Sequence, residues 1–305
     1  MINRILLVYN PKAGKGRFLP SLPGVIDLFT KAGYMVEVYP TQAQGDAVRL
    51  LMETEEEYKI IVPAGGDGTL DEIFTALVLS GKDIPVGYIP VGSTNDYAAS
   101  LGLSSNIMDA AADIISGKPY KVDAGVVNDH HVFAYVAAFG AFTDVAYATN
   151  QDMKNIFGHV AYLIEATKRL ADLKSYLMHV ETEDYEAEHE YIFGMITNSL
   201  SVGGIKNITG TEVLLDDGLF EVTLIHNPRN ILEMQEIVGC LLTQNYDTDL
   251  IDYFKADSLD IISEQEIPWT FDGEYGGSWS SIHIENRKCS VQLILNRNRG
   301  NELPI

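Results

Sequence analysis

Three glycines and one carboxylate fall within the five residues Gly65–Thr69. Glycine has no Cβ, so this density of glycine lets the backbone turn sharply and approach a ligand closely. An apolar run, Tyr58–Val62, precedes the turn, and a helical pattern follows it. Unpaired N–H groups and the positive end of a helix dipole meet in such an arrangement, which is typical of phosphate binding. Asp67 would repel a phosphate, so we expect it to serve a metal ion or a ribose.

The turn matches neither of the common nucleotide-binding motifs, G-x-x-x-x-G-K-[ST] and G-x-G-x-x-G. A purely structural alternative is a tight turn followed by a capped helix, because Thr69 and Glu72 have the spacing of a capping box. We favour a ligand site, since an ordinary turn requires one glycine rather than three.

Two further polar loops also follow predicted strands. Asn10–Arg17 carries Lys12, Lys15 and Arg17. In so acidic a chain these three cations point to a phosphate, and a solvated basic patch is the alternative. Gly92–Asp96 contains a Ser-Thr-Asn-Asp run, which offers more hydrogen-bonding groups than a single helix cap can use.

The elements that carry these loops alternate between strand and helix. Strand patterns at Ile5–Tyr9, Tyr34–Tyr39, Tyr58–Val62 and Pro85–Ile89 are each followed by a helical pattern. This alternation predicts a doubly wound, mostly parallel α/β domain over residues 1–122. The carboxyl ends of parallel strands meet at one edge of a sheet, where open α/β sheets bind ligands, so we expect the three loops to converge.

After this domain the pattern changes to short alternating runs separated by turn residues. It predicts an antiparallel β-sandwich domain over residues 123–290, with helices inserted near Ile156–Lys174 and Asn230–Leu242. Whether residues 291–305 complete the first domain is left open. Asp217-Gly218 and Asp272-Gly273 taken alone indicate hairpin turns.

The charge balance restricts the partners. The chain has 21 Lys and Arg against 43 Asp and Glu, a formal net charge of −22. Nucleic acid is therefore excluded as a partner, and docking on anionic lipid is opposed. The N-terminus lacks a signal-peptide pattern and no apolar run is long enough to span a bilayer, so we expect a cytoplasmic protein. The histidines have no zinc spacing, and a G-x-S-x-G elbow is absent.

Four motifs carry a resemblance to a known family. GGDGTLDEI, PVGSTNDYAASLGL, the opening NPKAGKG and the late FDGE resemble the diacylglycerol kinase catalytic-domain family. The nearest group is the bacterial soluble lipid kinases, related to sphingosine kinases and distantly to NAD kinase and phosphofructokinase. The resemblance covers essentially the whole chain. GGDGT alone is shared across that superfamily, whereas its combination with the other motifs is specific to the lipid-kinase branch.

The resemblance implies phosphorylation of a hydroxyl of diacylglycerol or a related lipid, with ATP and Mg²⁺, in a cleft between the two domains. It assigns the general base to Asp272, and we expect Asp67 to hold a catalytic Mg²⁺ and Glu274 to orient the base or hold metal. A structural magnesium site maps onto Asp217 and the backbone oxygens of Leu214 and Leu219. Leu214 stands where some relatives carry a carboxylate, which would weaken that site. The expected cofactor-binding residues are Asn10, Pro11, Lys12, Ala13, Gly14, Thr41, Gly65, Gly66, Asp67, Gly68, Thr69, Leu70, Asp71, Glu72, Thr94, Asn95 and Asp96.

Two departures from the family pattern are mild. Asp71 stands where Asn is common, and Ser93 stands where Thr is common. Two other functions stay open: a kinase of a soluble alcohol such as NAD or a sugar, and a nucleotide sensor without catalysis. Transient peripheral contact with the inner membrane face and a homodimer also stay open. One predicted helix has four cations on or beside it that would give it a basic face for such contact, with ordinary surface salt bridges as the alternative: Lys154, Lys168, Arg169 and Lys174.

Overall fold

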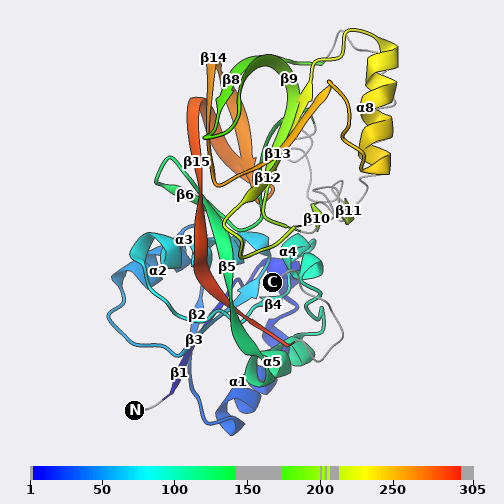
Figure 1. The fold of residues 1–305 in the computed structure, drawn as a ribbon. Helices are drawn as coiled ribbons and strands as arrows, with labels where there is room; N and C mark the ends of the chain where they lie inside the picture. The colour runs from blue at the N-terminus through cyan, green and yellow to red at the C-terminus, as the bar shows by residue number, and fades with distance from the viewer. Residues whose placement is uncertain (1–2, 142–172, 200, 203–204, 207–212, 297–305) are drawn as a thin grey trace. The chain divides into compact units, whose positions relative to one another are not determined.

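The structure is a computed structural model that describes residues 3–141, 173–199, 201–202, 205–206 and 213–296. The chain forms two compact units (Figure 1). The first comprises residues 1–124, 215–217 and 287–305, and the second comprises residues 125–214 and 218–286. The helix predicted near Ile156–Lys174 lies almost entirely outside the described residues.

The first unit is built on a parallel sheet. Among the described residues its four strands are β1 (Arg4–Tyr9), β2 (Met35–Pro40), β3 (Ile60–Gly65) and β4 (Ile89–Pro90). They run in the order β2-β1-β3-β4, and each neighbouring pair is parallel. The strands are short and apolar, as expected where helices cover both faces.

The helices of this unit lie on both faces of the sheet (Figure 1). On one face, Val25 and Phe29 of α1 and Ile114 of α5 join Ile5 and Leu7 in one buried cluster. On the other, α2 packs against α3. The predicted doubly wound fold is therefore confirmed. The helices are α1 (Leu22–Lys31), α2 (Asp46–Glu53), α3 (Asp67–Ser80), α4 (Asp96–Ser100) and α5 (Ile107–Ser116), with 3-10 turns at Ala13–Gly16 and Leu19–Ser21.

The end of the chain also belongs to this unit. The N–H of Val86 donates to the carbonyl of Gln292, and the N–H of Ile294 donates to the carbonyl of Val86, each at 2.8 Å. Leu293 and Val86 form a parallel bridge, and Val86 bridges Ile61 on its other side. Residues 292–294 thus extend the parallel arrangement beyond β3.

The second sheet is antiparallel wherever its pairing is resolved. Within the described residues it has nine strands in the order β13-β12-β9-β7-β14-β15-β5-β6, with β8 beside β9 and β14. The antiparallel domain predicted from the sequence is confirmed. The strands are β5 (Lys118–Val127), β6 (His131–Phe133), β7 (Val136–Gly140), β8 (Tyr176–Glu181), β9 (Glu186–Thr197), β12 (Phe220–His226), β13 (Ile251–Ala256), β14 (Ser258–Phe271) and β15 (Glu274–Leu295), with a separate hairpin of β10 (Ser201–Val202) and β11 (Ile205–Lys206).

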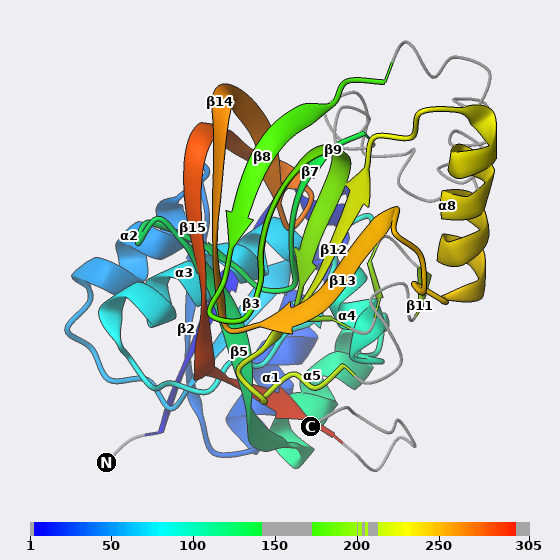
Figure 2. The same ribbon diagram turned by 45° about the horizontal axis from the view of Figure 1, so that its top comes forward.

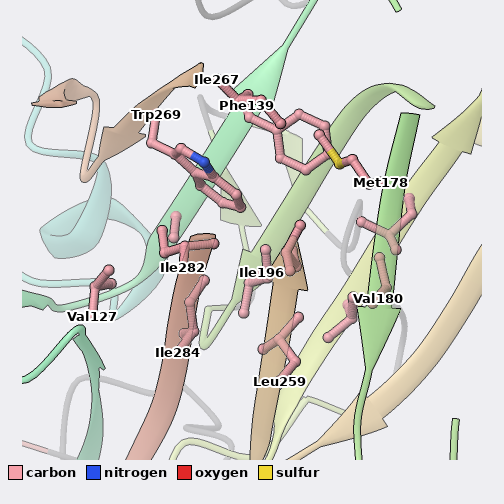
Figure 3. Close-up of a cluster of buried hydrophobic side chains, with 14 of the residues drawn as sticks. Val127, Phe139, Met178, Val180, Ile196, Leu259, Ile267, Trp269, Ile282 and Ile284 are labelled. Carbon is pink, nitrogen blue, oxygen red and sulfur yellow. The ribbon is translucent and has the colours of Figure 1, made fainter. Parts of the chain in front are cut away.

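Two apolar clusters hold the second unit together. Figure 3 shows the larger one, in which Trp269 and Phe139 lie beside aliphatic side chains such as Ile196 and Ile282. The ring centroids of Trp269 and Phe139 are 4.8 Å apart. The smaller cluster joins α8 (Ile231–Thr243) to the strands through buried side chains including Ile237. Figure 2 shows α8 as a separate helix beside the sheet. This helix is the one predicted at Asn230–Leu242.

Candidate active site

The glycine turn leads from β3 into α3 without a side-chain cap. Gly66 is the N-cap of α3, and Gly65 ends β3. A Cβ on Gly65 would lie 2.2 Å from Oγ1 of Thr69, and a Cβ on Gly92 would lie 2.5 Å from the Cα of Gly66. Both distances are too short for a side chain. Glycine at residue 65 leaves room for Thr69 within the same turn, and glycine at residue 92 lets the two loops touch. The predicted loops Gly65–Thr69 and Gly92–Asp96 therefore meet in the structure, as expected.

Asp67 and Asp96 meet at this contact. Oδ2 of Asp67 accepts the backbone N–H of Asp96 at 3.0 Å. Oδ1 of Asp67 is buried, and among the described residues it has no hydrogen-bond partner. Burial raises the pKa of Asp67 to about 6, and the nearby charge of Asp96 adds to the rise while backbone N–H groups oppose it. Burial raises the pKa of Asp96 as well. Two acidic residues thus lie at one contact, each with a carboxyl group whose charged form burial disfavours.

The loop after β1 lies against the same region. Oδ1 of Asn10 accepts the N–H of Lys12 at 2.9 Å, and a guanidinium N–H of Arg17 donates to the carbonyl of Pro90 at 2.9 Å. Gly14 has φ +53°, and a Cβ there would lie 2.0 Å from the carbonyl oxygen of Val91. Arg17 thus contacts the end of β4, whereas Lys12 is exposed and able to meet a ligand.

Thr41 and Glu72 were also expected to contact the nucleotide, and in the structure both make hydrogen bonds within the first unit. The N–H of Thr41 donates to the carbonyl of Tyr9 at 2.9 Å, at the end of β1. The predicted capping box of Thr69 and Glu72 is wrong, because α3 begins two residues before Thr69 and has no side-chain cap. The carboxylate of Glu72 instead accepts N–H groups at the start of α2.

Tyr88 contacts both glycine loops, and the sequence pattern did not single it out. Its hydroxyl lies 3.3 Å from the carbonyl oxygen of Gly65 and 3.5 Å from Oδ1 of Asn95. Asn95 adopts φ +54° and donates its amide to the carbonyl of Gly92 at 3.0 Å, so its side chain is used within the loop. The side chain of Leu70 is buried and can offer a ligand only its backbone. Of the other expected contacts, Pro11, Ala13 and Thr94 are half-buried in the loops, and Gly68 and Asp71 are half-buried in α3.

Asp272 lies in the second unit, at the turn between β14 and β15. Its carboxylate accepts three backbone N–H groups, from Ala134 at 2.6 Å and from Tyr135 and Val136 at 3.0 Å each. Asp272 is 7% exposed, whereas Glu274, two residues later, is exposed. Three donors hold the ionised carboxylate and fix the turn.

The loop expected to hold structural magnesium brings few ligand atoms. Leu214 is exposed and its side chain has no donor atom, and the carbonyl of Asp217 accepts the ammonium of Lys288 at 3.0 Å. Within the part of the chain that the structure describes, no group of three or more His, Cys, Asp or Glu side chains could hold a metal ion. A site here would depend on backbone oxygens and Asp217.

Asp123, beside this loop, is a buried carboxylate that the sequence pattern did not single out. It is fully buried, and its Oδ1 accepts the N–H of Cys289 at 2.7 Å. Its own N–H donates to the carbonyl of Leu215 at 2.7 Å. Only the presence of an acid within an apolar strand pattern could have drawn attention to it. Cys289 and Cys240 are free thiols, half-buried.

Comparison with known proteins identifies the family. Residues 4–127 match the diacylglycerol kinase catalytic domain, and residues 136–289 match the YegS C-terminal NAD kinase beta sandwich-like domain. The chain is 32% identical over 305 residues to a diacylglycerol kinase of Staphylococcus saprophyticus, which covers 99% of this chain and 98% of that protein. It is 32% identical over 279 residues to the diacylglycerol kinase of Staphylococcus carnosus, covering 91% and 90% respectively. The chain belongs to the diacylglycerol kinase family.

Solved structures agree with this fold. A protein of Bacillus anthracis strain Sterne superposes with a TM-score of 0.81 at 24% sequence identity, covering 97% of this chain and 98% of that one. As a member of the diacylglycerol kinase family, the chain is an enzyme of the kinase class. In the described residues, no helix is long and apolar enough to cross a membrane.

Proposed function

We propose that this diacylglycerol kinase family member transfers the γ-phosphoryl group of ATP to a hydroxyl of diacylglycerol or a related lipid. The observation that carries the proposal is the buried Asp67–Asp96 pair at the meeting of two glycine loops. The relatives named diacylglycerol kinase support the choice of lipid, because they match nearly the full length of the chain.

The nucleotide would be held by the loops of the first unit. Backbone N–H groups of Gly66, Asp67 and Gly68 at the start of α3 favour phosphate oxygens, and exposed Lys12 and Lys15 add positive charge. Thr41 and Thr94 supply hydroxyls beside them. Phosphoryl transfer depends mainly on positioning and on neutralising charge, so such loops suffice for much of the catalysis.

The residues around Asp67 fit a magnesium ion. The buried Oδ1 has no hydrogen-bond partner among the described residues, and burial makes the ionised form of the carboxylate unfavourable. A cation would satisfy that oxygen, with Asp96 as its neighbour. When bound, Mg²⁺ would neutralise charge on the phosphates. The loop of Leu214, Asp217 and Leu219 stays a weaker prediction, since the side chain of Leu214 has no ligand atom and the carbonyl of Asp217 already accepts the ammonium of Lys288.

The proton of the lipid hydroxyl would pass to a carboxylate of the turn Phe271–Glu274. Asp272 is our assignment for this general base, and the N–H groups of Tyr135 and Val136 would orient it. Glu274 is the exposed acid of the same turn, and it would orient the base or hold metal. We further propose a cytoplasmic protein that meets the inner membrane face transiently; a homodimer is compatible with this.

A phosphorylation assay tests the proposal. Radiolabelled ATP with Mg²⁺ is offered diacylglycerol in mixed micelles, sphingosine in micelles, or NAD in solution. We expect labelled lipid with diacylglycerol and little with the other two. Labelled NAD alone would support the second candidate, a soluble-alcohol kinase, which the net charge of −22 favours because it opposes docking on anionic lipid. ATP binding without transfer to any acceptor would leave a nucleotide sensor.

A further inference from the structure

Glu72 lies in the second turn of α3, and both oxygens of its carboxylate accept hydrogen bonds from the start of α2. Oε1 accepts the N–H of Gly45 at 2.8 Å, and Oε2 accepts the N–H of Ala47 at 3.0 Å. Gly45 is the N-cap of α2, at φ +82°, and as a glycine it has no side chain to cap the helix. The first N–H groups of a helix need such an acceptor, and a negative charge there also favours the helix dipole. Glu72 supplies this acceptor from another helix.

The turn before α2, residues 41–45, is held at its other end as well. The N–H of Thr41 donates to the carbonyl of Tyr9 in β1 at 2.9 Å. Within the turn, the carboxylate of Asp46 accepts the N–H of Gln42 at 2.7 Å. The turn is therefore stiff in itself, and Glu72 links it to the helix that begins at the glycine turn.

We propose that Glu72 is a positioning residue, which sets the affinity for the nucleotide through Thr41 rather than by touching the nucleotide. The inference rests on the proposed function, in which Thr41 and the Gly65–Thr69 turn contact the same ATP. The family resemblance predicts that Glu72 contacts the nucleotide. In the structure its carboxylate instead binds the start of α2. Because α3 starts at the glycine turn, Glu72 fixes the separation between the two contacts before ATP arrives, so less ordering is needed on binding.

The variant Glu72→Gln tests this link. It keeps the size of the side chain but turns one acceptor into an NH₂ donor, which cannot accept the N–H of Gly45 or Ala47. We expect the Kd for ATP, measured by calorimetry, to rise about tenfold. The KM for ATP should rise similarly while kcat stays within about twofold. Amide hydrogen exchange of the peptide spanning residues 41–50 should become faster.

The matched control is Glu57→Gln, which removes one exposed carboxylate before β3 and should change none of these values. A second comparison combines Glu72→Gln with Thr41→Val. If Glu72 acts through Thr41, the losses in ATP affinity do not add, because both changes remove the same contact. Additive losses would show that Glu72 meets the nucleotide separately and would overturn the proposal.

A lower melting temperature with unchanged ATP affinity would also overturn it, because Glu72 would then only stabilise α2. The outcome is separable from the proposed function. If the wild-type chain binds ATP but phosphorylates no lipid, the lipid kinase proposal fails, and the comparison of ATP affinities still decides the role of Glu72.

Discussion

Asp67 accepts the backbone N–H of Asp96 at 3.0 Å, and this bond joins the glycine turn after β3 to the loop after β4. Each residue brings a carboxylate into a place where water is largely excluded, and burial raises the pKa of both. Without a cation, the pair costs folding free energy at neutral pH. A bound cation would offset this cost and stabilise the folded protein.

Asp67→Asn should therefore stabilise the metal-free protein while abolishing phosphoryl transfer. The folded pKa of about 6 lies above the ordinary value of 3.8, so the unfolded chain loses its proton first as the pH rises. The penalty is absent below about pH 4 and complete above about pH 6. At pH 8 in EDTA, we expect urea unfolding to give a free energy about 2 to 3 kcal/mol higher for the variant.

The gain should shrink as the pH falls from 6 towards 4. Asp249→Asn, at an exposed aspartate, is the control and should leave the free energy of unfolding almost unchanged. An Asp67→Asn variant that is less stable than the wild type at pH 8 would contradict the burial argument.

The carboxylates of the β14–β15 turn can be told apart by two substitutions. Asp272→Asn keeps an acceptor oxygen but loses the charge that three N–H groups hold, so we expect kcat to fall by at least about a hundredfold with ATP affinity unchanged. Glu274→Gln should lower kcat less if it only orients the base. A larger loss at Glu274 than at Asp272 would move the base to Glu274 and leave Asp272 as the residue that fixes the turn.

The sequence predicted those parts of the site that depend on local chemistry. Gly65 and Asp67 stand out because a strand, a glycine turn and a helix are adjacent in the chain. The capping box failed because Glu72 finds its partners 25 and 27 residues away, where no short pattern records them. The same holds for Asp123, whose N–H donor belongs to Cys289, 166 residues later. Long-range partners of buried carboxylates are set by packing, which a single sequence does not display.

Gly14→Ala should damage the loop after β1. The added Cβ would lie 2.0 Å from the carbonyl oxygen of Val91, and φ is +53°. We expect a loss of about 3 kcal/mol or more in the free energy of unfolding and a large loss of ATP binding.

Two controls separate the effect of the positive φ from that of the close approach to Val91. Gly33→Ala has the strained φ of +89° but nothing within 4 Å, and should cost about 1 kcal/mol. Gly239→Ala, inside α8 with nothing within 4 Å, should be neutral or slightly stabilising. Equal stability of the Gly14 and Gly33 variants would argue against the close approach to Val91.

A hydrogen-bonded group in the second unit gives the opposite pH dependence. Oδ2 of Asp252 accepts the hydroxyl of Tyr191 at 2.7 Å and lies 2.8 Å from Nε2 of His226. Burial alone would raise the pKa of Asp252, but the hydrogen bonds with His226 and Tyr191 outweigh it and lower the pKa below its ordinary value of 3.8. The stabilisation is therefore complete above pH 4 and is lost as the pH falls through the folded pKa.

Asp252→Asn should lower the free energy of unfolding by about 1 to 3 kcal/mol at pH 7. That difference should narrow at the lowest pH at which urea unfolding is still cooperative, with Asp249→Asn as the exposed control. A difference that widens on acidification would mean that the interaction with His226 does not favour the ionised carboxylate.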